Sequence, residues 1–235
     1  MSKFILNETQ ADRDKELSEI LGLPLGQIMS IQMATPDSIR IWTEKAGKPI
    51  KKSDYVGLYS EYKYLNLPAY LKTLMMTSVQ RRDKELMNIL KTIEHKRCLD
   101  FGSGVGTHAI AMTQRGNDVT MMDVSGPLLE FALKRFHHRG LNVGYVFNDI
   151  DLPEEEYDFV CCSDVLEHVC SPLVELKRIT ASLKPGGLAH LLVSPIVKPS
   201  SGHFLEPIQE WRQKCLPYLE KNYKRAGHTL WLKRQ

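Results

Sequence analysis

The stretch Cys98-Leu-Asp-Phe-Gly-Ser-Gly-Val-Gly106 joins a short apolar run to a loop with three glycines. Residues 96–101 are typical of a buried strand, and residues 107–115 are typical of a helix that ends at Gly116. Glycine is favoured where a backbone turns sharply or must approach a ligand closely. The stretch therefore predicts a strand–loop–helix unit whose loop either binds a nucleotide or is a purely structural turn.

The alternation of strand and helix continues toward the C-terminus. Further strands are predicted over 118–124, 142–148, 157–163 and 188–194, and helices over 128–138 and 172–183, with the turn Lys184-Pro-Gly-Gly187 after the second helix. Such βαβ units predict an α/β fold with a mostly parallel sheet covered on both faces. A helix over 207–217 and strands over 219–225 and 228–233 predict a closing hairpin, which permits an antiparallel strand.

The first 95 residues lack this alternation. A helix is predicted over 12–21, and a long amphipathic helical pattern begins at Pro68 and continues to Ile93. The apolar face of these helices needs the sheet to cover it. We therefore expect a helical cap over residues 1–95, acting as a substrate-side lid, and an α/β domain over residues 96–235.

Composition and charge narrow the function classes. The 235 residues are 43% hydrophobic and carry a formal net charge of +3, which is too small to indicate a nucleic-acid groove or an anionic membrane partner. No stretch has the roughly 18 consecutive apolar residues that span a bilayer, and the N-terminal apolar run is too short for a secretory signal. We expect a cytoplasmic protein with no membrane partner, whose five cysteines are reduced core thiols.

Details of the glycine loop distinguish between nucleotides. Its glycines are spaced G-x-G-x-G, unlike the dinucleotide fingerprint, and no Gly-Lys-Ser/Thr of a P-loop is present. Asp100, directly before the loop, suits a ligand with an ammonium or sulfonium group. Asp123, at the end of the second strand, can accept both ribose hydroxyls. Asp149 and Ile150, after the third strand, offer an acceptor for an adenine amino group and an apolar wall, so S-adenosylmethionine fits best.

Taken in order, these motifs resemble those of the class I S-adenosylmethionine-dependent methyltransferases. Besides the glycine loop, the resemblance rests on Tyr-Asp-Phe-Val-Cys-Cys-Ser-Asp-Val-Leu-Glu-His-Val and Leu-Lys-Pro-Gly-Gly, and it covers residues 96–195. It implies a Rossmann-like three-layer sandwich around a seven-stranded sheet with an antiparallel last strand. The cofactor-binding residues it implies are Asp100, Gly102, Ser103, Gly104, Gly106, Asp123, Val124, Asp149, Ile150 and Ser163.

Within this family the sequence is most similar to small-molecule methyltransferases. The segment 54–64, rich in tyrosine, resembles the entry helix of such enzymes, which makes Tyr55 and Tyr59 candidates for the lid. The alternative is that these rings only pack the cap onto the sheet. The resemblance implies a small-molecule acceptor whose reacting atom is O, N or C.

The segment Asp164-Val-Leu-Glu-His168 follows the fourth strand, where the acceptor approaches the methyl group. On a helical turn, Asp164, Glu167 and His168 share one face. Three hypotheses remain open: His168 acts as a general base, the three residues hold a divalent metal with His203 as a further ligand, or Glu167 and His168 only orient the loop. Related acid-x-x-Glu-His patterns accompany metal in small-RNA and ubiquinone-pathway methyltransferases, although with Glu in the first position.

The expected activity is therefore methyl transfer from S-adenosylmethionine to a small molecule, with a divalent metal not favoured. Two alternatives are a non-catalytic regulatory or partner subunit that keeps the fold, and an RNA-directed enzyme with a metal-assisted Asp-x-x-Glu-His site. The low net charge and the lack of an Asn/Asp-Pro-Pro-Tyr/Phe motif after the fourth strand argue against a nucleic-acid substrate.

Overall fold

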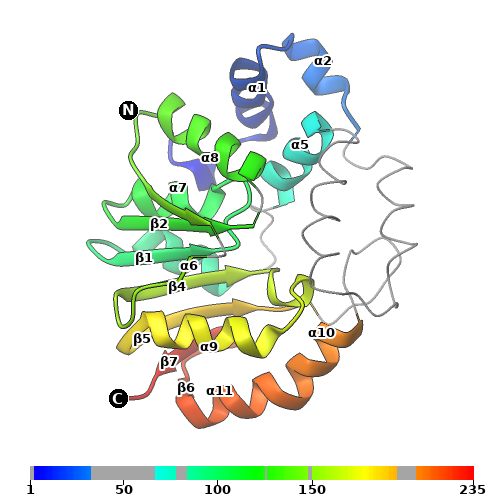
Figure 1. Cartoon of the computed structure of the whole chain (residues 1–235). Helices are drawn as coiled ribbons and strands as arrows, with labels where there is room; N and C mark the ends of the chain where they lie inside the picture. Colours follow the sequence, from blue (N-terminus) through cyan, green and yellow to red (C-terminus); the bar gives the residue numbers. More distant parts are fainter. Residues whose placement is uncertain (1–2, 33–66, 78–83, 125, 148–149, 195–204) are drawn as a thin grey trace.

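A computed structural model describes residues 3–32, 67–77, 84–124, 126–147, 150–194 and 205–235. Within them, one seven-stranded sheet forms the centre of the chain (Figure 1). The strands are β1 Arg97–Phe101, β2 Asp118–Asp123, β3 Gly144–Phe147, β4 Tyr157–Ser163, β5 Leu183–Leu192, β6 Tyr223–Arg225 and β7 Leu230–Lys233.

The strand order is β3-β2-β1-β4-β5-β7-β6. Strands β1 to β5 pair in parallel, whereas β7 is antiparallel to both of its neighbours, β5 and β6. This confirms the predicted mostly parallel seven-stranded sheet with an antiparallel last strand. The chain leaves β1 toward β2 and β3 on one side and returns through β4 on the other. The carboxyl ends of β1 and β4 therefore form a switch point, where open α/β sheets bind ligands.

Helices cover both faces of the sheet, as expected for strands that are apolar on both sides (Figure 1). On β1, Cys98 belongs to the apolar cluster under α6 (Lys84–Thr92), α7 (Thr107–Thr113) and α8 (Gly126–His138). The next residue, Leu99, belongs to the cluster under α9 (Pro172–Ser182) and α11 (Leu216–Asn222). No disulfide joins the five cysteines, all of which lie in the described part of the chain, but Cys170 is exposed, so the expectation of core thiols holds for four of them.

The C-terminal region differs from its prediction in two places. The helix expected over 207–217 starts at Leu205 and continues to Asn222 through α10 (Leu205–Glu210), a π-helical turn (Trp211–Cys215) and α11. The strand expected over 219–225 is consequently only β6. The predicted turn Lys184-Pro-Gly-Gly187 lies within β5 as an irregularity, because the pairing moves from Tyr157 with Leu183 to Phe159 with Leu188.

The N-terminal region begins with a 3-10 turn (Ile5–Asn7), α1 (Gln10–Leu21) and α2 (Leu25–Ser30). A capping box between Thr9 and Asp12 begins α1, and Gly22, in the left-handed conformation, ends it. The long amphipathic pattern forms α5 (Leu67–Thr77) and α6, two helices with residues 78–83 between them outside the described part. In the described part of the chain, no helix combines the length and apolarity needed to cross a membrane.

Candidate active site

A cavity of about 180 Å³ opens at the carboxyl ends of β1 and β4. The loop after β1 and the residues after β4 form one wall, and α5 and α6 form the other. It is lined by Leu74, Thr77, Leu86, Met87, Gly102, Ser103, Gly104, Val105, Thr107, His108, Ser163, Asp164 and Leu192. The structure thus brings together the glycine loop and Ser163, which lie about sixty residues apart in the sequence, as the family resemblance implies.

The glycine loop is fixed by hydrogen bonds to β2. The backbone N–H groups of Gly102 and Ser103 both donate to the carbonyl oxygen of Met122, at 2.8 and 2.9 Å. Gly102 has φ +75° and Gly104 has φ +51°, a region that residues with a side chain rarely adopt. A Cβ atom on Gly104 would meet nothing within 4 Å, so the loop leaves open space beside the cavity for a ligand.

Asp123 lies at the end of β2 beside this loop. Its Oδ2 accepts a hydrogen bond of 2.7 Å from the backbone N–H of Gly104. The carboxylate therefore borders the loop, where it can also accept hydroxyl donors from a ligand. The next residue, Val124, and Ile150, after the neighbouring parallel strand β3, are both exposed. Asp149 lies outside the described residues.

Asp100 lies near the end of β1, before the glycine loop, as expected, and its side chain is buried. It is 2% exposed, and its Oδ2 accepts a hydrogen bond of 3.0 Å from the backbone N–H of Ala109 in the first turn of α7. Burial raises the pKa of this carboxyl to about 6, although the nearby His108 acts to lower it. The geometry thus gives Asp100 the role of holding α7 behind the loop, because it satisfies one of the free N–H groups at the start of that helix.

Two other loop residues differ in their surroundings. A Cβ on Gly106 would lie 3.1 Å from both Ala132 Cβ and Met121 Sδ, so this glycine permits close packing of the loop on α8 and β2. Ser103 lines the cavity, and in the described structure its buried Oγ has no hydrogen-bond partner. Buried hydroxyls are usually satisfied, so this oxygen fits a site completed by a ligand.

The predicted convergence of Asp164, Glu167 and His168 on one helical face is wrong in the described structure. Only a 3-10 turn, Leu166–His168, forms here, and Asp164 precedes it with φ +55°. Asp164 is exposed and lines the cavity, His168 is half-buried, and Glu167 is fully buried. The backbone N–H of Ser194, after β5, donates to Glu167 Oε1 at 2.7 Å. Glu167 therefore ties the end of β4 to the end of β5, which supports the structural hypothesis for this residue.

A different group meets the geometric requirement for a metal site within the described residues. Ligand atoms of Asp100, His108 and Cys161 lie within 4.8 Å of one another. Asp100 and Cys161 are register partners on β1 and β4, and His108 reaches them from α7, with Cys161 Sγ 3.7 Å from His108 Nδ1. These contacts also suit a buried hydrogen-bonded group that holds α7 on the sheet.

Several predictions lie outside the described residues, namely those for Tyr55, Tyr59 and His203. Other cavity-lining residues were not predicted from the sequence. His108 could have been found, because it lies in the first turn of the helix that follows the glycine loop. Leu74 and Met87 gave no signal beyond their helical spacing, because an apolar residue of a cavity wall has the same pattern as one of a core.

Comparisons with known proteins agree with this site. A family profile described as a methyltransferase domain matches residues 71–228. A ubiquinone biosynthesis O-methyltransferase of Coxiella burnetii is 33% identical over 99 residues, 41% of this chain and 42% of that protein. One of Actinobacillus pleuropneumoniae is 34% identical over 131 residues, 52% of this chain and 55% of that protein. The matches to these curated relatives thus span only 42% and 55% of their lengths.

Among solved structures, the chain is similar to phosphoethanolamine N-methyltransferase 2 of Haemonchus contortus in complex with S-adenosyl-L-methionine. The two are 30% identical, the match covers 45% of this chain and 27% of that one, and the TM-score is 0.40.

Proposed function

The chain belongs to the methyltransferase-domain family, and on this premise we propose that it transfers the methyl group of S-adenosylmethionine to a small-molecule acceptor. The observation that carries the proposal is the arrangement of the glycine loop, Asp123 and Ser163 at the carboxyl ends of β1, β2 and β4, respectively. Open space beside Gly104 and the buried hydroxyl of Ser103 are the features of this chain that fit such a cofactor.

Different residues of the site would bind different parts of the cofactor. Gly102, Ser103 and Gly104 would contact the methionine part of the cofactor, and Asp123 would accept the ribose hydroxyls while holding the Gly104 N–H. Ile150 is exposed and offers an apolar surface to the adenine. The bound cofactor supplies a strongly electrophilic methyl group. The protein's contribution is then to hold the acceptor in line with this methyl, and alignment alone accounts for much of the acceleration in reactions of this kind.

We infer that the acceptor enters between the loop and the wall formed by α5 and α6. That wall presents Leu74, Leu86 and Met87, which favour an apolar body on the acceptor. Asp164 lines the cavity and is exposed. Of the three residues of its motif, we therefore assign to Asp164 the binding of the acceptor's polar group. Relatives named as O-methyltransferases lead us to favour a hydroxyl oxygen as the nucleophile.

Asp123→Ala tests the proposed cofactor site. We expect this change to raise the Kd for S-adenosylmethionine about 10- to 100-fold, because two hydrogen bonds to the ribose are lost at about 0.5–1.5 kcal/mol each. Titration calorimetry of wild type and variant measures the effect. Absence of binding to the wild type at millimolar cofactor would overturn the proposed function.

Asp118→Ala is the matched control, since Asp118 begins the same strand and its side chain is 71% exposed far from the loop. We expect Asp118→Ala to bind the cofactor as the wild type does. Equal binding by both variants and the wild type would show that Asp123 does not contact the ribose.

A further inference from the structure

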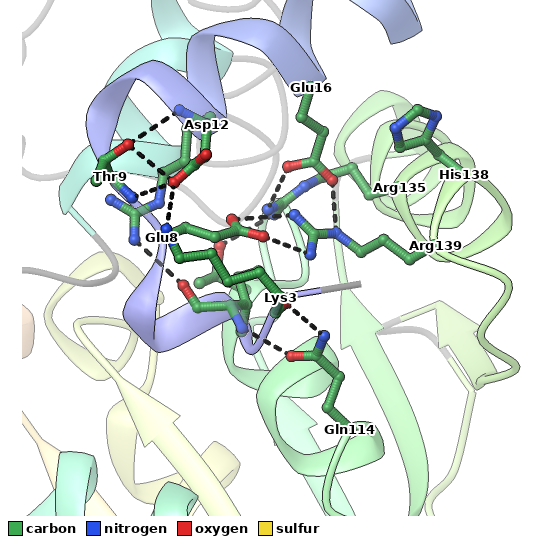
Figure 2. Close-up of polar contacts among 12 residues, drawn as sticks. Lys3, Glu8, Thr9, Asp12, Glu16, Gln114, Arg135, His138 and Arg139 are labelled. Atoms are coloured by element: carbon green, nitrogen blue, oxygen red, sulfur yellow. Dashed lines mark hydrogen bonds and ion pairs between the residues drawn. The ribbon is translucent and has the colours of Figure 1, made fainter. Parts of the chain in front are cut away.

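A buried ion-pair network joins the N-terminal helix α1 to α8 (Figure 2). Glu16 of α1 lies between two arginines, accepting a hydrogen bond of 3.0 Å from Arg135 Nη2 and one of 2.7 Å from Arg139 Nε. The carboxylate of Glu8 accepts hydrogen bonds from both terminal nitrogens of Arg139, at 2.8 and 3.1 Å. Arg135 is fully buried, and the other three side chains are at most 7% exposed.

This ion-pair network is unusual because its charged side chains are buried. Charged groups lose their hydration when they are buried, and apolar residues of similar size often give equal or better stability. Burial acts to raise the pKa of Glu16, but Arg135 and Arg139 outweigh it and lower the pKa. The carboxylate is thus charged at neutral pH, and α1 must stay in one position relative to α8 to keep these pairs.

The side chain of Arg135 also contacts the segment that follows the glycine loop. Nη1 of Arg135 donates to the carbonyl oxygen of Val105 at 2.6 Å and to Thr107 Oγ1 at 3.0 Å. Val105 and Thr107 both line the cavity and lie one and three residues after Gly104. A single guanidinium therefore connects Glu16 of the N-terminal helix to the backbone that bounds the cofactor cavity.

Apolar and ionic contacts link α1 to the opposite wall as well. Val105 belongs to an apolar cluster that contains Leu17 of α1 and Leu71 and Met75 of α5, the helix that carries cavity-lining Leu74. Nζ of Lys72, also on α5, lies 3.3 Å from Asp14 Oδ1 of α1, and both side chains are at most 5% exposed. Helix α1 thus contacts α5 directly and is joined to the loop through Arg135 and the shared apolar cluster, although no residue of α1 lines the cavity in the described structure.

From these contacts we propose that α1 is a positioning element of the cofactor site, with Arg135 as the residue that transmits its docking to the loop. Docking of α1 and binding of cofactor are then linked, so each strengthens the other by the same factor. The proposal rests on the proposed function, since it requires that the cavity binds S-adenosylmethionine or its product S-adenosylhomocysteine.

The wild-type protein provides the first test and needs no variant that must fold. We expect saturating S-adenosylhomocysteine to slow amide hydrogen exchange in α1, residues 10–21, as well as in the loop. If the product binds and the loop is protected while exchange in α1 is unchanged, the linkage is absent and the proposal is overturned. If the product does not bind at all, the proposed function itself fails, which is a separate result.

Glu16→Gln gives the second test, because it keeps the shape of the side chain and removes the charge that faces Arg135. We expect the Kd for S-adenosylhomocysteine to rise about tenfold. Glu19→Gln, the same change on the same helix at a side chain 44% exposed, should leave the Kd within about twofold. Leu219→Ala, in the apolar cluster on the other face of the sheet, should lower the Tm without changing the Kd.

Together the controls separate positioning from general stability. A folded Glu16→Gln protein that binds the product as tightly as the wild type would overturn the proposal. A Kd that rises equally in Leu219→Ala would also overturn it, because the effect would then follow from lost stability anywhere in the fold. A rise confined to Glu16→Gln, with protection of α1 in the wild type, is the supporting result.

Discussion

Gly102→Ala is expected to lower the free energy of unfolding by about 2–5 kcal/mol and to abolish cofactor binding. Gly102 has φ +75°, where a residue with a Cβ costs about 1–2 kcal/mol. The added Cβ would also clash with Val165 Cγ2, and relieving such overpacking costs about 1–3 kcal/mol. Val165 belongs to the packed segment after β4, so the clash pushes apart the two strand ends that form the cavity. Urea unfolding and calorimetry with S-adenosylmethionine measure both effects.

Gly140→Ala separates the two causes of this loss. Gly140 follows α8 with φ +64°, and a Cβ there would meet nothing within 4 Å. The free energy of unfolding of this variant should therefore fall by only about 1–2 kcal/mol, and its cofactor affinity should be unchanged. Adding Val165→Ala to Gly102→Ala should restore part of the lost stability by removing the atoms that clash. Equal losses for Gly102→Ala and Gly140→Ala would mean that contact with Val165 contributes nothing.

The sequence predicted those parts of the fold in which the pattern of apolar residues fits only one type of secondary structure. Strand β4 was predicted over 157–163 and has the same bounds, because a run that is apolar on both faces fits only a buried strand of that length. The region 219–225 has two interpretations. Leu219 and Tyr223 are both buried and lie four residues apart, which suits a helix as well as a strand end. Packing of α11 on the sheet decides between them, and this information is not local in the sequence.

In the candidate site, too, only local features could be predicted from the sequence. The glycine loop and Asp123 were predictable, because their backbone requirements and strand-end positions are local features. The roles of Asp164 and Glu167 were not, since their shared face assumed a regular helical turn. The positive φ of Asp164 turns the chain before the 3-10 turn begins, and Glu167 points to β5. The network around Arg135 had no sequence signal at all, because its partners lie 119 and 30 residues away.

Glu167→Gln is expected to stabilise the protein increasingly as the pH rises. Burial raises the pKa of this carboxyl to about 8, with Asp164 adding to the rise and the backbone N–H groups of Ser194 and Glu167 opposing it. In the unfolded chain its pKa is about 4.3. The folded state thus favours the protonated form, and this contribution to stability is present below about pH 4 and lost as the pH rises toward 8. Between pH 5 and 8 the loss amounts to about 3–4 kcal/mol.

The Gln side chain is neutral throughout and keeps an oxygen that can accept from the Ser194 N–H. The difference in unfolding free energy between Glu167→Gln and wild type should therefore grow by about 3–4 kcal/mol from pH 5 to 8, as followed by urea unfolding. Glu220→Gln, at an exposed position on α11, is the matched control and should give a difference that does not vary over this range. A constant difference for Glu167→Gln would show that Glu167 is ionised in the folded protein. It would then be available as an anionic ligand or base, and the structural role assigned to it here would have to be abandoned.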